Sequence, residues 1–445
     1  MKRPRMMSLL MTMLLCASGS GCGRRNPVGE ISVKESGIEV VDRGTALDGR
    51  EWPSWRGPRG DGVAVDQPLP TVWSESTGIL WRADVPGRGH CSPVVFGGSV
   101  YLSTALVAQQ KQQVMAFDGG SGEPKWTTVL HDGGLPSERQ LHHKSSHANG
   151  TVACDGERIY AAFLNSDSIT ASAVDLTGQR VWQQELGKFV SQFGYAPSPV
   201  LYKSLVIFAA DNPGGGWLAA VDSASGQIAW RVGRGNVASY SSAAVASVGG
   251  RDQLLISGCD AVTSYDPASG DELWKTPCVA EATCGTIVTT SDLIFASGGY
   301  PEKETVCLST EGRRIWSNRT QVYEPSLVIT GNQVIAVSDD GIAYCWAANT
   351  GDMIWRERLG GNFSASPLVC NDRVYASNLS GETFVFTATG DKFRLISRNT
   401  LGDDCYASPA AAGGRLFLRI GVGNGSDRRE QLVCLGTPVA DGIGR

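Results

Sequence analysis

The chain has 445 residues, of which 42% are hydrophobic and 19% charged, and its net charge is -5 with both signs interspersed. Enough apolar side chains are present for a sizeable core, and the absence of a basic stripe argues against nucleic-acid binding. The 55 glycines suit many short strands joined by tight turns. Beyond the first segment, no apolar run reaches the length of a membrane-spanning helix.

The N-terminus predicts an export signal. Lys2, Arg3 and Arg5 precede a short apolar run over residues 6–17, and small residues follow it. We therefore expect a signal peptide over residues 1–21, which targets the chain across a bacterial inner membrane.

A cysteine follows that signal directly. The small residues before Cys22 resemble a bacterial lipobox, although Gly19 stands where such boxes usually carry leucine. We expect Cys22 to be lipidated, with ordinary signal cleavage as the alternative. Residues 22–50 are polar and unpatterned, which predicts a flexible tether.

A tryptophan-ended motif then recurs along the chain, as in AVDSASGQIAW. Successive copies lie roughly 40–55 residues apart, which is the spacing of propeller blades. In each copy an aspartate and a Ser/Thr-Gly pair form a turn, and the next strand ends on an indole that fills the gap between twisted sheets. The repeat tryptophans are Trp126, Trp182, Trp230, Trp274, Trp316 and Trp355, and a degraded copy ends near Ile396. The repeated aspartates are interpreted as turn formers and not as catalytic carboxylates: Asp118, Asp175, Asp222 and Asp266.

A second motif precedes each copy, as in SPVLYKSLVIFAA from Ser198. It contains two apolar strand-length runs split by a turn, so the two motifs together predict a four-stranded blade. About eight such motifs predict an all-β, eight-bladed propeller over residues 51–445. The last blade lacks a tryptophan strand, while a spare one with Trp81 lies before the first blade. We therefore expect closure by exchange of this N-terminal strand into the last blade, and we expect the segment with Trp52, Trp55 and Arg56 to pack on the ring.

The repeats resemble the PQQ-type propeller repeat, Ala-x-Asp-x-x-Thr-Gly-x-x-x-Trp, over residues from about 78 to 436. The opening EWPSWRGPRGDG resembles a group of exported bacterial PQQ-like repeat proteins. Two branches share this repeat. Quinoprotein dehydrogenases hold pyrroloquinoline quinone and calcium in the funnel, whereas BamB-type lipoproteins are non-catalytic and assist outer-membrane protein assembly. The adjacent cysteine pair on which many of the dehydrogenases stack the quinone is missing here, and the size and signal are closer to the BamB type.

Aligning the inner-strand motifs places one residue per blade at one mouth of the central channel. Polar and aromatic types dominate this ring, as a binding funnel requires. The binding candidates are His90, His147, Tyr240, Thr283, Tyr323, Ser364 and Tyr406, with Ala196 at the remaining position.

Histidines and cysteines offer further candidate chemistry. All five histidines lie between His90 and His147, but their spacing fits no common closed metal site, so a long loop between blades is the favoured interpretation. Several cysteines occupy the repeat position held elsewhere by alanine and are expected to be buried hydrophobes: Cys307, Cys345 and Cys434. Cys278 and Cys284 are close enough in sequence to pair across a blade junction.

The resulting hypothesis is a monomeric, non-catalytic binding propeller of the cell envelope, held at the periplasmic face of a membrane through Cys22. Its partners would be envelope proteins, and it would carry no cofactor or metal. One alternative is an oxidoreductase that uses pyrroloquinoline quinone with calcium. Another is a propeller that binds an envelope glycan or small ligand.

Overall fold

The computed structural model describes residues 33–34, 38–42 and 50–437. The predicted signal peptide (residues 1–21), Cys22 and most of the predicted tether lie outside the described residues. Within the described part of the chain, no helix is long and apolar enough to cross a membrane.

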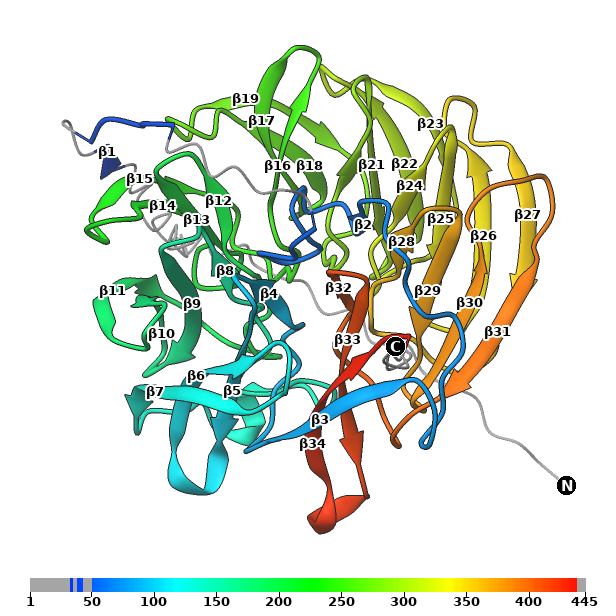
Figure 1. The fold of residues 1–445 in the computed structure, drawn as a ribbon. Helices are drawn as coiled ribbons and strands as arrows, with labels where there is room; N and C mark the ends of the chain where they lie inside the picture. The colour runs from blue at the N-terminus through cyan, green and yellow to red at the C-terminus, as the bar shows by residue number, and fades with distance from the viewer. Residues whose placement is uncertain (1–32, 35–37, 43–49, 438–445) are drawn as a thin grey trace, which may run out of the picture. The chain divides into compact units, whose positions relative to one another are not determined.

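Eight sheets are arranged around a central axis, each with four antiparallel strands, and we number them as blades 1 to 8 in chain order (Figure 1). Blade 1 contains β4 (Val94–Phe96), β5 (Ser99–Leu106), β6 (Lys111–Asp118) and β7 (Pro124–Asp132), and blade 2 contains β8 (Ala153–Cys154), β9 (Arg158–Asn165), β10 (Ser168–Asp175) and β11 (Arg180–Lys188). Blade 3 contains β12 (Val200–Tyr202), β13 (Leu205–Ala210), β14 (Trp217–Asp222) and β15 (Ile228–Gly233), and blade 4 contains β16 (Ala244–Val248), β17 (Arg251–Gly258), β18 (Ala261–Tyr265) and β19 (Glu272–Pro277). Blade 5 contains β20 (Val288–Thr289), β21 (Leu293–Gly298), β22 (Glu304–Ser309) and β23 (Arg314–Asn318), and blade 6 contains β24 (Val328–Thr330), β25 (Gln333–Val337), β26 (Ile342–Ala347) and β27 (Met353–Arg358). Blade 7 contains β28 (Leu368–Cys370), β29 (Arg373–Ser377), β30 (Glu382–Thr387) and β31 (Leu395–Thr400), and blade 8 contains β32 (Ala410–Ala412), β33 (Arg415–Val422), β34 (Arg429–Leu435) and β3 (Ile79–Val85). The predicted all-β propeller with eight four-stranded blades is therefore confirmed.

Two further short strands extend blades. β1 (Val33–Lys34) pairs with β15, and β2 (Val63–Ala64) runs parallel to β28. The helical content of the described residues is three short 3-10 turns, at Val107–Gln109, Glu138–Gln140 and Gly425–Asp427.

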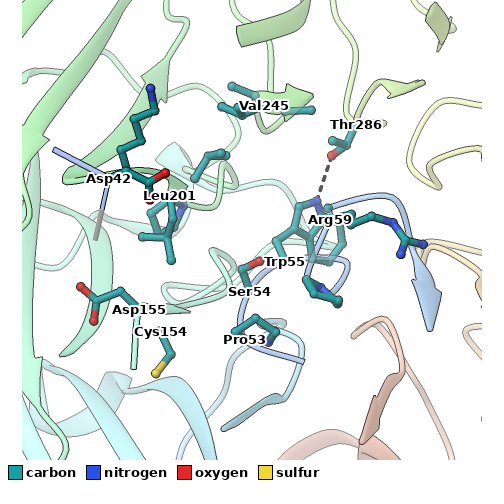
Figure 2. Close-up of a pocket in the computed structure, with 17 residues that line it drawn as sticks. Asp42, Pro53, Ser54, Trp55, Arg59, Cys154, Asp155, Leu201, Val245 and Thr286 are labelled. Carbon is teal, nitrogen blue, oxygen red and sulfur yellow. Dashed lines mark hydrogen bonds between the residues drawn. The ribbon is translucent and has the colours of Figure 1, made fainter. Parts of the chain in front are cut away.

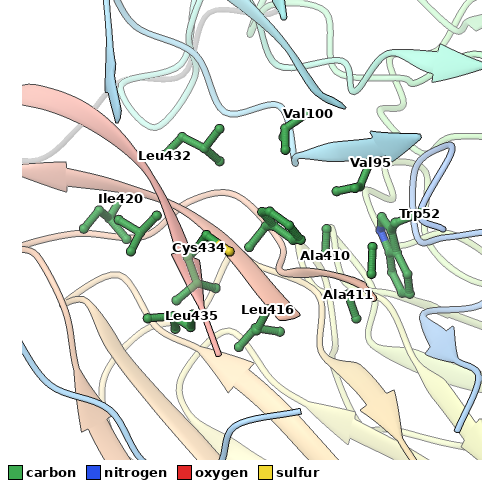
Figure 3. Packing of buried hydrophobic residues seen from close by; sticks show 14 of the residues in the cluster. Trp52, Val95, Val100, Ala410, Ala411, Leu416, Ile420, Leu432, Cys434 and Leu435 are labelled. Carbon is green, nitrogen blue, oxygen red and sulfur yellow. The ribbon is translucent and has the colours of Figure 1, made fainter. Parts of the chain in front are cut away.

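The sheet of blade 8 combines strands from both ends of the described chain. Its order is β3-β34-β33-β32, and β3 lies antiparallel to β34 with Val85 opposite Glu430. A buried cluster joins this sheet to its neighbours and includes Trp52, which forms a β-bridge with Val95 of blade 1. Figure 3 shows the labelled members of this cluster: Trp52, Val95, Val100, Ala410, Ala411, Leu416, Ile420, Leu432, Cys434 and Leu435. The expected packing of the Trp52 segment on the ring is thus observed.

Six tryptophans pack on the motif glycine in the turn of the next blade: Trp81, Trp126, Trp182, Trp230, Trp274 and Trp316. Trp355 instead packs against Phe386 and Phe393 of blade 7. The Trp230 indole N–H donates to the Pro267 carbonyl oxygen (3.2 Å), and a Cβ added to Gly270 would lie 2.7 Å from the Trp230 ring. The same pairing joins blade 8 to blade 1, because the Trp81 indole donates to the Gly119 carbonyl oxygen (3.1 Å) and covers Gly122. The motif glycine therefore serves two needs, a positive φ and room for an indole.

The motif aspartates form the turns as predicted. Asp118 Oδ1, for example, accepts from the backbone N–H groups of Gly120 and Ser121, both at 2.9 Å. Asp175, Asp222 and Asp266 make equivalent bonds two and three or four residues ahead.

The ten cysteines of the described residues are all free thiols. The suggested pairing of Cys278 with Cys284 is therefore wrong. Both cysteines lie in the connection between blades 4 and 5, and burial raises the pKa of the Cys278 thiol to about 11. Cys307, Cys345 and Cys434 have no solvent exposure, as expected for small residues on strands packed between two sheets.

Candidate functional site

A ring of side-chain hydroxyls surrounds the axis, one from the start of each blade. The backbone N–H of one ring residue donates to the hydroxyl oxygen of the next, as in Ser92 to Thr151 (2.9 Å) and Ser408 to Ser92 (3.0 Å). The step from Ser242 is the exception, because the Thr286 hydroxyl oxygen accepts instead from the Trp55 indole N–H (2.9 Å). We call these residues the hydroxyl ring: Ser92, Thr151, Ser198, Ser242, Thr286, Ser326, Ser366 and Ser408.

The residues two positions before each ring hydroxyl line a cavity of about 510 Å³, here named the axial funnel. They are His90, Asn149, Ala196, Tyr240, Cys284, Glu324, Ser364 and Tyr406. Trp55, Phe193, Tyr300 and Tyr323 also line the funnel, so aromatic planes and hydroxyl groups make up much of its wall.

The structure brings together five of the seven predicted funnel residues: His90, Tyr240, Tyr323, Ser364 and Tyr406. His147 and Thr283 lie elsewhere. The His147 Nε2 atom lies 2.9 Å from the Pro136 carbonyl oxygen, and Thr283 is fully buried against the Ser239 and Ser257 hydroxyls. In these two blades the ring hydroxyl comes from a threonine that no proline follows, so the alignment on the Ser-Pro motif was offset. The residues two positions before these threonines are Asn149 and Cys284, and they line the funnel instead.

A charged pair spans the funnel. Lys144 Nζ donates to Glu324 Oε1 at 2.8 Å, and the Ser364 hydroxyl donates to the other carboxylate oxygen. Lys144 belongs to the loop between blades 1 and 2 (residues 134–150, the strap), whereas Glu324 precedes the inner strand of blade 6. The strap therefore reaches from one side of the ring to the other.

Behind this pair, Asp339 holds the backbone of blade 6. Its carboxylate accepts from the backbone N–H groups of Tyr323 (2.8 Å) and Glu324 (2.9 Å). Burial raises the pKa of Asp339, and these two hydrogen bonds oppose the rise. Asp339 thus anchors the backbone from which the Glu324 side chain extends.

His90 of blade 1 and Tyr406 of blade 8 form a stacked pair in the funnel wall, with ring centroids 4.2 Å apart and an interplanar angle of 3°. Burial, with help from the nearby Arg88, Arg419 and Arg428, lowers the pKa of His90 well below its ordinary value. The imidazole is therefore neutral at pH 7. Both His90 and Tyr240 line the funnel, and within the described part of the chain neither His90 Nε2 nor the Tyr240 hydroxyl has a hydrogen-bond partner.

Trp55 closes the inner end of the funnel. Its side chain lines both the funnel and a second cavity of about 310 Å³, which is formed by residues that follow the ring hydroxyls, such as Pro199 and Val245. Figure 2 shows Trp55 beside Ser54 and Pro53, bonded to Thr286. Since inner-strand residues before and after the ring lie on opposite sides of it, Trp55 separates the two cavities.

Sequence reasoning missed several funnel residues. Phe193 and Tyr300 lie in connections outside the inner-strand alignment, and Lys144 reaches the funnel only because the strap folds across it. Glu324 was masked by an inverted Pro-Ser order, which places the ring hydroxyl at Ser326. An alignment on the recurring serine or threonine of the hydroxyl ring, rather than on Ser-Pro, would have found Glu324 from the sequence.

The sequence profile of one protein family matches residues 57–192, 139–357 and 302–399, which together span 57–399. That family is described as outer membrane protein assembly factor BamB. The chain belongs to this family. No curated protein sequence matches the chain.

Solved structures with the same fold include both BamB and quinoprotein enzymes. BamB from Moraxella catarrhalis has a TM-score of 0.59 at 15% identity, covering 80% of this chain and 98% of that one. The quinohemoprotein alcohol dehydrogenase from Comamonas testosteroni has a TM-score of 0.65 at 12% identity (88% and 81%), and ADHIIG from Pseudomonas putida HK5 has 0.60 at 12% (88% and 82%). At these identities the likeness establishes the fold.

The funnel residues do not fit a calcium-bound quinone. Among the residues that the structure describes, Glu324 is the only carboxylate that lines the funnel, and it is engaged by Lys144 and Ser364. Calcium prefers six to eight oxygen ligands with several carboxylates. Across residues 33–34, 38–42 and 50–437, no group of three or more His, Cys, Asp or Glu side chains is placed to hold a metal.

Proposed function

We propose that this chain is a non-catalytic binding propeller of the cell envelope that engages a protein partner through the face onto which the axial funnel opens. The proposal rests on one observation above all. The funnel is closed at its inner end by Trp55, and two exposed aromatic side chains, Phe193 (49% exposed) and Tyr300 (66% exposed), stand at its lining.

Exposed aromatic side chains beside a cavity are typical of protein-binding surfaces, because aromatic residues dominate the energy of such interfaces. The funnel adds a concave pocket into which a partner side chain can insert. The Glu324–Lys144 pair and the unpartnered Tyr240 hydroxyl would then supply polar contacts to that side chain.

The family description supports the class of partner. Its members are described as factors in outer-membrane protein assembly, so we propose that the partner is an envelope protein of that process. Export through the signal at residues 1–21 and lipidation at Cys22 would bring the propeller to the membrane where such partners are found.

Site-specific photocrosslinking in intact cells tests this proposal. A photoreactive residue at Phe193 or Tyr300 should form discrete adducts with an envelope protein, and Ala196→Trp, which fills the funnel, should abolish them. Matched controls are Val181 and Met353, which are similarly exposed (45% and 53%) but lie on outer strands β11 and β27. Equal adducts from all four positions, or adducts from the controls alone, would contradict the proposal.

A further inference from the structure

The second cavity, of about 310 Å³, lies between the Trp55 segment and the innermost strands of blades 2, 3 and 4. One wall is formed by residues 53–55 and 58–60, and the other by residues 154–155, 199–201 and 243–245. Figure 2 shows Pro53, Ser54 and Trp55 on one segment, with Leu201 and Val245 on the strands around it. Because Trp55 separates this cavity from the funnel, it is a distinct candidate site.

The Trp55 segment already pairs with the inner edges of other blades through the main chain. Val95 of blade 1 and Trp52 exchange both main-chain hydrogen bonds, each 2.9 Å long. The Val369 N–H of blade 7 donates to the Gly62 carbonyl oxygen (2.8 Å), where β2 runs parallel to β28. The innermost strands of this propeller can therefore accept an additional extended segment.

The two bonded residues of blades 1 and 7 stand at the same position, three residues after the ring hydroxyl of their blade. In blade 2 this position is Cys154, whose N–H donates to the Pro53 carbonyl oxygen (2.7 Å). In blades 3 and 4 it is Leu201 and Val245, and both line the second cavity. Among the described residues, no main-chain hydrogen bond from outside its own sheet reaches either of these two.

The register of blade 3 shows where the Leu201 main chain points. Leu201 directly precedes the pair that closes a two-residue hairpin, Tyr202 with Leu205, and Val369 has the same place in blade 7. Residues of an antiparallel ladder alternate between bonding their partner strand and facing away from it. The Leu201 N–H and carbonyl oxygen therefore face away from β13, as the Val369 N–H faces away from β29.

The inner edge of blade 3 is also less covered than that of blade 7. All three residues of β12 are half-buried, whereas all three residues of β28, which β2 covers, are buried. An unpaired strand edge is a template for a further strand. Blade 3 thus presents such an edge to a cavity, in the register that blade 7 uses to bind β2.

We propose that the second cavity binds an extended segment of another polypeptide, which adds a strand to the inner edge of blade 3 by main-chain hydrogen bonds with Leu201. Strand addition of this kind draws affinity from the main chain and selectivity from pockets for alternate side chains. Pro53, Trp55 and Pro199 line the cavity, so a peptide residue that points at them should be apolar. The site is independent of the partner proposed at the funnel.

Peptide binding to the full chain tests the proposal. The probe is an end-capped, fluorescently labelled peptide of alternating valine and threonine with terminal lysines, and fluorescence anisotropy should show saturable binding. Leu201→Pro removes the outward N–H, which a strand edge tolerates, and should weaken binding about 3- to 10-fold, since one main-chain hydrogen bond is lost. Leu201→Ala keeps that N–H and should weaken binding less.

Ile329→Pro is the matched control. Ile329 stands three residues after Ser326 in blade 6, at the position equivalent to Leu201, and it lines neither cavity. This variant should bind the peptide as the unaltered chain does. Absence of saturable binding, or equal affinity of Leu201→Pro and Ile329→Pro, would overturn the proposal.

Residue-resolved hydrogen exchange on the unaltered chain covers the case in which Leu201→Pro fails to fold. Without peptide, the Leu201 amide should exchange faster than the Val369 amide, which is bonded to Gly62. When nine-tenths of the chain is bound to peptide, exchange at Leu201 should slow about tenfold and exchange at Val369 should stay the same. An unchanged Leu201 amide at saturating peptide would contradict strand addition at blade 3.

Discussion

At the residue scale, two partly buried histidines, His90 and His131, are expected to make the stability of the propeller depend on pH. His90 stacks on Tyr406, and His131 packs edge-on against Phe163 with ring centroids 6.0 Å apart. Burial, together with Arg180, lowers the pKa of His131 to about 4. A histidine that is neutral when folded and charged when unfolded favours the unfolded state below the unfolded pKa.

The free energy of unfolding should therefore fall as the pH drops from about 6.5 to about 4. His131→Phe keeps the ring packing and removes the proton site, whose Nε2 atom has no partner among the described residues. The variant should flatten the slope by up to about 1.4 kcal/mol per pH unit, because one fewer proton is taken up on unfolding. Urea titrations at several pH values measure this slope. An unchanged slope with equal stability at pH 7.5 would show that His131 does not contribute.

At the element scale, the blade junction depends on a glycine that lies under the preceding indole. Gly270 has a φ of +74° and no room for a Cβ beside Trp230, whereas Gly250 has a φ of +77° and open space around it. The two positions thus share the backbone conformation and differ in the packing.

Gly270→Ala should destabilise the protein by about 1–3 kcal/mol more than Gly250→Ala, because only the first adds overpacking to backbone strain. Chemical denaturation followed by intrinsic fluorescence compares the two. Equal losses would mean that the indole shifts freely and that the Trp230–Gly270 contact is not a rigid joint.

The same junction explains why the blades could be predicted from the sequence. Tryptophan, aspartate and glycine recur at fixed spacing because each blade must make the same turn and cover the same gap, so local pattern and tertiary contact agree. The strap could not be predicted in this way. Lys144 meets Glu324 across the ring, 180 positions away in sequence, and no periodicity marks that contact.

At the scale of the whole molecule, an offset of one or two residues in the sequence alignment of a blade is enough to misplace its predicted funnel residue. In the two blades concerned, the predicted residues His147 and Thr283 lie two positions and one position before the residues that line the funnel, Asn149 and Cys284, and both lie outside it. For the segment around Trp55, the sequence predicted the packing on the ring but not the position at the floor of the funnel. Its packing on the ring was expected, but its role as the floor of the funnel depends on contacts with blades far apart in sequence, such as that with Thr286.

The fold is common to BamB and to quinoprotein enzymes, so the proposed binding function rests on the residues that line the funnel. Among the described residues that line the funnel, Lys144 and Glu324 pair with each other, and hydroxyl groups and aromatic rings make up much of the remaining wall. We propose that this lining suits a protein side chain better than an anionic quinone with calcium. The Trp55 indole in the funnel floor provides a reporter for either ligand.

Titration of the full chain with pyrroloquinoline quinone and calcium, followed by tryptophan fluorescence, tests the non-catalytic account most directly. The account predicts no saturable quenching at micromolar quinone. Saturable quenching that a chelator abolishes, and that Ala196→Trp also abolishes by filling the funnel, would contradict it and identify the funnel as a quinone site.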